Sequence, residues 1–259
     1  TKGAAQDTLM AQYNDLASVE RLLEANDGAV AAVIVEPVAA NMGVVPPEDG
    51  FLQGLRTLCD RHGALLIFDE VITGFRLAAG GAQEYFGVQA DLVTYGKIIG
   101  GGMPVGAYAG SRALMEQVAP TGPVYQAGTL SGNPVAMAAG LAQLNIITDH
   151  PEIYTVMETS ASYIANHLRA SAEKHGIAMQ VNQIGSLLCP YFTETPVNCY
   201  AAAKKSDTKR YAAYFNGMLK RGIYLAPSQF EAMFVSSVHT QNDLACTVQA
   251  AEETLSEMA

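Results

Sequence analysis

The chain has 259 residues, of which 49% are hydrophobic and 15% charged, and its formal net charge at pH 7 is −10. This composition argues against disorder and allows one large or two modest domains with buried cores. The acidic balance disfavours a general nucleic-acid-binding protein, and no apolar window of about 18 residues predicts a membrane span. The four scattered cysteines, without a C-x-x-C pair, indicate neither a zinc site nor a disulfide framework and fit a reducing compartment.

The first half of the chain predicts alternating strands and helices. After a polar, helix-prone start with a helix at Leu16–Glu24, apolar runs at Val30–Val38, Ala64–Val71 and Leu92–Ile99 predict strands. These runs are continuous rather than alternating, which is typical of a parallel sheet covered on both faces. A helical pattern at Phe51–His62 separates the first two runs, so we expect an α/β unit with a right-handed crossover.

The second half changes character. A short strand (Val105–Gly110) and an apolar helix (Ser131–Ile147) lead to a boundary at residues 148–151, where Asp149 is expected to cap a helix that has Pro151 in its first turn. Beyond it we predict helices at 152–175, 208–221 and 243–258, and strands at 178–182, 187–193, 223–226 and 233–238. The predicted fold class is α/β, with part of a large, mainly parallel-sheet domain over 1–148 and a small α+β domain over 149–259.

Polar residues end the predicted strands: Glu36, then Asp69 and Glu70, then Lys97. Ligands of open parallel sheets bind beyond the carboxyl ends of the strands, so Asp69 and Lys97 are expected to reach one cleft. The alternative is that Asp69 and Glu70 begin a loop and that Lys97 is merely solvated. Strand ends by themselves leave both interpretations open.

Several common motifs are missing. The pair Gly96-Lys97 is no P-loop, because Asp91 stands where that motif needs glycine and Ile98 where it needs Ser or Thr. The glycines at 100–102 lack the G-x-G-x-x-G spacing, the five histidines form no metal-binding motif, and no G-x-S-x-G elbow occurs. A metal site is therefore not expected.

What remains is Asp-Glu-Val at 69–71 and Tyr-Gly-Lys at 95–97, a combination that pyridoxal phosphate chemistry requires. A lysine amine forms a Schiff base with the cofactor aldehyde. An aspartate keeps the pyridine nitrogen protonated, because a nearby negative charge favours the charged form of a base. The protonated ring then acts as an electron sink.

The whole chain resembles the glutamate-1-semialdehyde 2,1-aminomutases, a family of class III, fold-type I pyridoxal-phosphate enzymes of tetrapyrrole (porphyrin and chlorophyll) biosynthesis. Five long matches in order make the resemblance specific, whereas Asp-Glu-Val and a later Gly-Lys by themselves would indicate only the wider class III aminotransferases. The matching segments are VEPVAANMGVVPP (35–47), LLIFDEVITGFR (65–76), DLVTYGKIIGGGMPVGAYAG (91–110), GPVYQAGTLSGNPVAMAAG (122–140) and GIYLAPSQFEAMFVSSVHT (222–240).

The resemblance implies roles at matching positions. Lys97 would be the Schiff-base lysine and proton shuttle, and Asp69 the partner of the pyridine nitrogen. Val71 would pack on one face of the ring, a role compatible with an ordinary buried strand residue. Asn41 would lie near the phenolic oxygen of the cofactor, the alternative being a loop amide in an Asx turn. Ala40 replaces an expected glycine, and its methyl group would crowd the turn if its φ were positive.

Two further assignments follow from the same resemblance. Gly128 and Thr129 would donate hydrogen bonds to the cofactor phosphate of the other subunit of a homodimer. The alternative for Thr129 is a cap for the helix near Ser131, and both roles are compatible because helix starts attract phosphate. Glu231 would face the site and help govern substrate exchange or a lid, with a plain surface carboxylate as the alternative.

The implied reaction is an internal amine transfer that converts glutamate 1-semialdehyde to 5-aminolevulinate, with the cofactor cycling through its pyridoxamine phosphate form. The resemblance also implies a cytoplasmic setting, or the plastid stroma in a plant or alga. The acidic charge and the lack of a long apolar window predict no nucleic-acid or membrane partner. The competing enzyme class is the ω-aminotransferases, which often carry a carboxylate-clamping arginine near the C-terminus. The equivalent stretch here, Glu231–His239, has no arginine, which favours the aminomutase.

A third interpretation is a non-catalytic piece that folds or dimerises with a partner. The chain starts at Thr1 without a signal peptide, and we expect it to begin inside a longer protein. The resemblance implies a preceding N-terminal segment that carries a second phosphate-binding loop, an aromatic residue stacked on the cofactor and the arginine for the substrate carboxylate. On this expectation the isolated chain binds cofactor weakly and needs that segment for activity.

Overall fold

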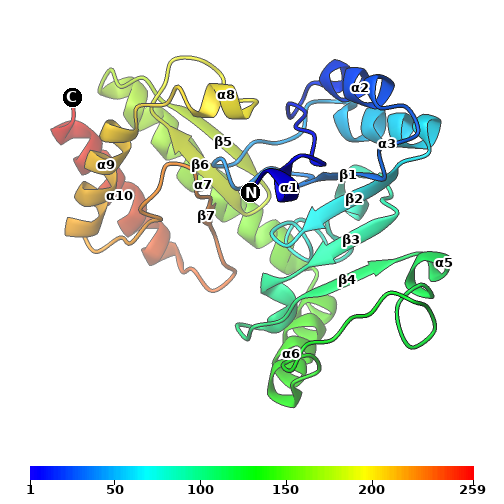
Figure 1. The fold of residues 1–259 in the computed structure, drawn as a ribbon. Helices are drawn as coiled ribbons and strands as arrows, with labels where there is room; N and C mark the ends of the chain where they lie inside the picture. Colours follow the sequence, from blue (N-terminus) through cyan, green and yellow to red (C-terminus); the bar gives the residue numbers. More distant parts are fainter.

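A computed structural model describes residues 1–259, except for the side chain of Ala4, and contains two separate sheets (Figure 1). The first has the order β1-β2-β3-β4, with β1 at Ala32–Val35, β2 at Leu65–Glu70, β3 at Leu92–Tyr95 and β4 at Ala107–Gly110. The first three strands are parallel, and β4 runs antiparallel to β3. The predicted α/β class with a mainly parallel sheet is confirmed.

Helices α2 (Leu16–Ala25) and α3 (Phe51–His62) pack together beside this sheet. The bounds of α3 are those that its apolar spacing predicts, and it ends where Gly63 takes the left-handed conformation. Asp15 caps α2 by accepting a hydrogen bond from the Ser18 amide at 2.9 Å. Together the helices and strands enclose one core cluster, which includes Leu23, Phe51, Leu52, Leu55, Leu58, Leu66, Phe68 and Val93.

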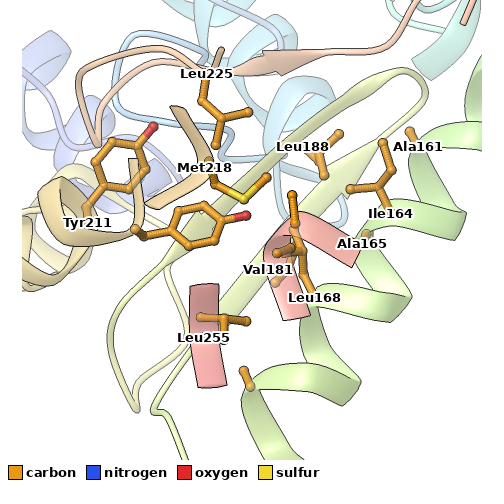
Figure 2. Close-up of a cluster of buried hydrophobic side chains, with 14 of the residues drawn as sticks. Ala161, Ile164, Ala165, Leu168, Val181, Leu188, Tyr211, Met218, Leu225 and Leu255 are labelled. Atoms are coloured by element: carbon orange, nitrogen blue, oxygen red, sulfur yellow. The ribbon is translucent and has the colours of Figure 1, made fainter. Parts of the chain in front are cut away.

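The second sheet is antiparallel, with the order β5-β6-β7: Gln180–Ile184, Leu187–Tyr191 and Met233–Phe234. Three long helices pack with it, namely α7 (Glu152–Lys174), α9 (Thr208–Lys220) and α10 (Gln241–Glu257). Figure 2 shows side chains from these helices converging on the sheet. The labelled members are Ala161, Ile164, Ala165, Leu168, Val181, Leu188, Tyr211, Met218, Leu225 and Leu255.

A further core cluster joins the two sheets. It combines residues 38–45, 72, 77 and 82 from the first part of the chain with residues 187–232 from the second. Among its fully buried members are Val38, Val44, Leu187 and Tyr191. The segment that follows β1 is therefore packed directly against the second sheet.

Several predicted boundaries are wrong. The helix expected from Ser131 is α6, Pro134–Asp149, and Asn133 caps it by accepting from the amides of Val135 and Ala136. Asp149 is consequently the last residue of α6, not the cap of the next helix.

No strand forms at 223–226. Gly222 is left-handed after α9, and the Ile223 amide donates to the Met218 carbonyl, so this segment closes the helix instead. The last predicted strand shortens to the two residues of β7.

Short helices escaped prediction because each has at most six residues: α1 (Lys2–Ala5), α4 (Gly81–Phe86), the 3₁₀ helix η1 (Lys97–Gly100), α5 (Arg112–Met115) and α8 (Tyr200–Ala203). Within the described residues, no helix has both the length and the apolar character needed to cross a membrane.

The contact between α7 and α10 predicts a pH effect. Glu252 accepts hydrogen bonds from Lys174 and Ser171 and lies 2.9 Å from His175 Nε2, and these partners lower its pKa from 4.5 to about 2. The ionised carboxylate therefore stabilises the fold above about pH 4.5, and this contribution disappears as the pH falls towards 2. We expect Glu252→Gln to lower the Tm by roughly 1–4 °C at pH 7.

The difference in Tm between Glu252→Gln and the wild type should shrink steadily in thermal melts recorded below pH 4.5. Glu173→Gln is the control, because this exposed carboxylate on α7 has no side-chain partner within the described residues. A Tm difference that stays constant from pH 7 to pH 3 would contradict the assigned role of Glu252.

Candidate active site

The carboxyl ends of β2 and β3 lie side by side. The parallel register places Asp69 opposite Thr94 and Glu70 opposite Tyr95. Asp69 is half-buried, and its Oδ1 accepts from the Val71 amide at 3.1 Å and from Thr94 Oγ1 at 3.2 Å. Its Oδ2 has no hydrogen-bond partner in the described part of the chain. One carboxylate oxygen is thus fixed by the strands while the other is available to a ligand.

Lys97 follows directly after this strand end. The prediction that the strand continues to Ile99 is wrong, because β3 ends at Tyr95 and Lys97 opens the 3₁₀ helix η1. Lys97 has a φ of +47°, in the left-handed region that non-glycine residues rarely adopt. Its side chain is exposed and, among the residues described, its amine has no ion-pair or hydrogen-bond partner. A strained backbone and a free amine are typical of functional positions.

Gly96 brings Val71 close to the lysine segment. A Cβ at position 96 would lie 3.2 Å from Val71 Cγ1, tighter than an ordinary van der Waals contact. Glycine is therefore the residue that lets the chain turn from β3 into η1 over Val71. The predicted residues Asp69, Val71 and Lys97 are brought together at one sheet edge.

Helix α6 supports η1 through two glycines that sequence reasoning missed. A Cβ at Gly140 would lie 2.2 Å from the Ile99 carbonyl oxygen, and one at Gly101 would lie 2.5 Å from the Ala139 carbonyl oxygen. The two backbones are therefore in direct contact, which holds the segment bearing Lys97. The signal in the sequence was a glycine inside an alanine-rich helix, but its packing partner is about 40 residues away.

The turn after β1 carries Asn41. Glu36 holds this turn with both carboxylate oxygens: Oε2 accepts from the Ala40 amide and Oε1 from Asn41 Nδ2, each at 2.9 Å. Ala40 is buried, and among the described residues the non-glycine positions with positive φ do not include it. The crowding considered for its methyl group therefore does not arise.

Glu70 lies in the interior of the protein although it neighbours Asp69. It is fully buried, and its Oε2 accepts from the Ala82 amide at 2.6 Å and from Thr73 Oγ1 at 3.1 Å. Burial raises the pKa of Glu70, against the opposing effect of these hydrogen bonds. Glu70 thus secures the start of α4, and only Asp69 of the pair is directed to the edge.

The remaining predicted residues are exposed and lie apart from Asp69 in the sequence. Gly128 and Thr129 belong to the loop before α6, whose next residues line an apolar groove of about 550 Å³ together with Ile99 and Val105. Thr129 does not cap α6, because Asn133 does, so that alternative is wrong.

Glu231 lies beside Phe230, whose carbonyl accepts from the Gly43 amide at 2.8 Å. A backbone hydrogen bond thus links the segments of Asn41 and Glu231.

The chain is similar to known aminotransferase-fold proteins over nearly its whole length. Residues 3–250 match the family described as aminotransferase class-III. The glutamate-1-semialdehyde 2,1-aminomutase of Ruminiclostridium cellulolyticum is 62% identical over 256 residues, 99% of this chain and 59% of that protein. The protein of the same name from Alkaliphilus oremlandii is 58% identical over 258 residues, 100% of this chain and 60% of that protein. The chain thus spans about three-fifths of these relatives.

Solved structures share the fold. A glutamate-1-semialdehyde-aminomutase from Pseudomonas aeruginosa, in complex with PMP, matches with a TM-score of 0.87 and 27% identity, covering 97% of this chain and 57% of that one. A β-phenylalanine aminotransferase from Variovorax paradoxus matches with a TM-score of 0.86 and 32% identity, covering 95% and 56%. Two enzyme classes therefore share this arrangement of strands and helices.

The close packing of α6 on η1 predicts the effect of one methyl group. Alanine is the better helix former by roughly 1 kcal/mol, but at position 140 its Cβ would push the Ile99 carbonyl away. We expect Gly140→Ala to destabilise the protein by roughly 1–3 kcal/mol and to speed amide exchange in residues 97–100. Thermal unfolding and hydrogen exchange measure the two effects.

Gly54→Ala is the matched control, because its new Cβ would meet only the flexible end of the Leu16 side chain. If Gly140→Ala were as stable as the wild type and exchanged at the same rate over η1, the described contact would not hold this segment.

Proposed function

Because this chain belongs to the class-III aminotransferase family, we propose that the protein is a pyridoxal-phosphate-dependent aminomutase that converts glutamate 1-semialdehyde to 5-aminolevulinate. The observation that carries the proposal is the juxtaposition of Asp69 and Lys97 at the ends of paired strands. The names of relatives at 53–62% identity support the substrate. Since the chain spans about three-fifths of those relatives, the activity is proposed for the full-length polypeptide.

The residues at this edge fit a pyridoxal phosphate ring. Asp69 offers a half-buried carboxylate oxygen without a partner among the described residues, and Lys97 offers an unpaired amine. Val71 is half-buried and supplies an apolar side chain next to Gly96. A carboxylate, an amine and an apolar wall match the pyridine nitrogen, the aldehyde and a face of one heteroaromatic ring.

When bound, pyridoxal phosphate supplies an electron sink for breaking a bond at the amine-bearing carbon. Asp69 keeps the pyridine nitrogen protonated, since its negative charge favours the charged form of that base. Lys97 would hold the cofactor through Nζ, and its amine would be the group that moves a proton at the substrate carbon. Asn41 would contact the phenolic oxygen, and Gly128 and Thr129 would bind the cofactor phosphate of the other subunit of the homodimer.

A second candidate is an ω-aminotransferase that uses a separate amine donor. The stretch 231–239 lacks an arginine, which favours the aminomutase. However, the guanidinium of Arg76 lies 4.6 Å from the ring centroid of Phe234 within that stretch. Burial lowers the pKa of Arg76 to about 10 and, among the described residues, no carboxylate neutralises it. A cation at this position suits a substrate carboxylate, which glutamate 1-semialdehyde and a keto acid both carry, so it is compatible with either enzyme.

We also propose that the protein works as a homodimer in the cytoplasm or plastid stroma, with residues 1–148 in a large cofactor-binding domain and 149–259 in a small one. An N-terminal segment of the same polypeptide would complete the cofactor site. Two exposed features support a covering partner: β4, whose residues are all exposed, and the apolar groove between α6 and η1. Large exposed apolar surfaces of this kind mark association sites.

Lys97 and Asp69 give the decisive test of the proposed function in the full-length protein. We expect Lys97→Ala to abolish covalent attachment of pyridoxal phosphate, measured by absorbance and by mass spectrometry after borohydride reduction, because no other amine occupies this position. Asp69→Asn should keep the attachment but lower the rate of 5-aminolevulinate formation roughly 100-fold or more, since a neutral amide cannot hold the protonated pyridine nitrogen.

Lys205→Ala and Asp60→Asn are controls on exposed residues and should behave as the wild type. Formation of 5-aminolevulinate without any added amine donor supports the aminomutase, whereas a strict need for a keto acid acceptor would favour the ω-aminotransferase. Unchanged attachment in Lys97→Ala would exclude both.

A further inference from the structure

The turn that carries Asn41 is held by three hydrogen bonds, two of them to side chains of the second sheet and one to the loop before β7. Tyr191 Oη on β6 donates to the Met42 carbonyl at 2.9 Å, and Asn182 Nδ2 on β5 donates to the Val44 carbonyl at 2.8 Å. The Gly43 amide donates to the Phe230 carbonyl at 2.8 Å. Each of three successive residues of the turn, 42–44, therefore has one backbone polar group hydrogen-bonded to a residue about 140 or more positions away.

Tyr191 is the most enclosed of these contacts. Its side chain is fully buried, and burial raises its pKa, so the hydroxyl stays a proton donor. Gly43 has a φ of +85°, and a Cβ there would lie 2.1 Å from Tyr191 Oη. The phenol ring thus lies against bare backbone, in a space that exists only because position 43 has no side chain.

The opposite side of the turn is fixed by Glu36, which accepts from the Ala40 amide and from Asn41 Nδ2. Asn41 consequently lies between two anchors: the Glu36 carboxylate after β1 and the Tyr191 hydroxyl on β6. Loss of the hydroxyl would leave the carbonyl of the buried Met42 without its donor, a costly state for a buried polar group. The turn would then relax at the position next to Asn41.

We propose that Tyr191 is a positioning residue of the cofactor site: through the Met42 carbonyl it fixes the turn that presents Asn41. The Gly43–Phe230 hydrogen bond links this turn to the segment of Glu231. The inference rests on the proposed function insofar as Asn41 contacts the cofactor. Its structural half, the clamp on residues 39–45, is independent of that function.

Tyr214 provides the control that distinguishes loss of the hydrogen bond to the turn from loss of a buried hydroxyl group in general. It is a second fully buried tyrosine that packs with the second sheet, and its hydroxyl has no hydrogen-bond partner in the described structure. Tyr→Phe at either position removes one buried oxygen and keeps the ring. Only the change at Tyr191 removes a hydrogen bond to the turn.

The experiment compares Tyr191→Phe and Tyr214→Phe in the full-length protein with pyridoxal phosphate as the probe. We expect Tyr191→Phe to raise the Kd for the cofactor by roughly three- to thirtyfold, the range for a lost buried hydrogen bond. It should also raise the pH midpoint of the bound cofactor's visible absorbance, because a displaced Asn41 stabilises the ionised phenolic oxygen less. Amide exchange over residues 39–45 should become faster, and Tyr214→Phe should change none of these.

The inference would be overturned if Tyr191→Phe and Tyr214→Phe had the same Kd for pyridoxal phosphate, the same pH midpoint of absorbance and the same amide exchange over residues 39–45. If the wild type fails to attach cofactor at Lys97, the proposed function fails, and exchange over 39–45 in Tyr191→Phe still decides the clamp. Should Tyr191→Phe not fold, Asn182→Ala removes the donor to Val44 from the same turn. It should shift the midpoint in the same direction, and an unshifted midpoint with wild-type exchange would overturn the proposal.

Discussion

The parallel pairing of β2 with β3 is the constraint on which the candidate site depends. Backbone hydrogen bonds join the two strands from Ile67 and Leu92 to Glu70 and Tyr95, so both end at the same sheet edge. Buried Phe68 and Val93 anchor the paired strands in the core. Asp69 and the segment of Lys97 are therefore fixed relative to one another by the sheet itself, while the loops beyond only refine their positions.

Those refinements come from two directions. The backbones of helix α6 and η1 are in contact at Gly140 and Gly101. Side chains of strands β5 and β6 donate hydrogen bonds to backbone carbonyls of the turn after β1. In both places, a segment without regular strand pairing is held through its backbone by a neighbouring helix or strand. Loops that carry chemistry need such support, because they have few contacts of their own. Both sheets thus support the candidate site, although Asp69 and Lys97 both belong to the first part of the chain.

Adjacent carboxylates on β2 have opposite environments for a simple geometric reason. Side chains alternate between the two faces of a strand, and β2 shows this alternation in its burial. Asp69 keeps an unpaired oxygen at the strand end, whereas Glu70 points into the interior and binds the start of α4. The same alternation explains why burial raises the pKa of Glu70 in particular. Two adjacent acidic residues consequently differ in burial and in hydrogen bonding, and Glu70 has a structural role.

Local patterns in the sequence determined the elements with strong periodicity and clear stops. The helix at Phe51–His62, the three parallel strands and the helix ends at Gly176 and Gly222 follow from side-chain spacing and from the left-handed freedom of glycine. Asp69 and Lys97 became candidates because polar residues near the ends of two apolar runs match pyridoxal phosphate chemistry, although the second strand ends before Lys97.

Tertiary structure alone decided the contacts between distant segments. The fit of Gly140 against Ile99, the bond from Tyr191 to Met42 and the burial of Glu70 each join residues through packing that no local pattern encodes. The strand predicted at 223–226 failed for a related reason: its residues complete the end of α9 instead of pairing. Hydrophobic spacing fixes which face of an element is buried, but which backbone lies against it depends on the three-dimensional arrangement of the whole chain.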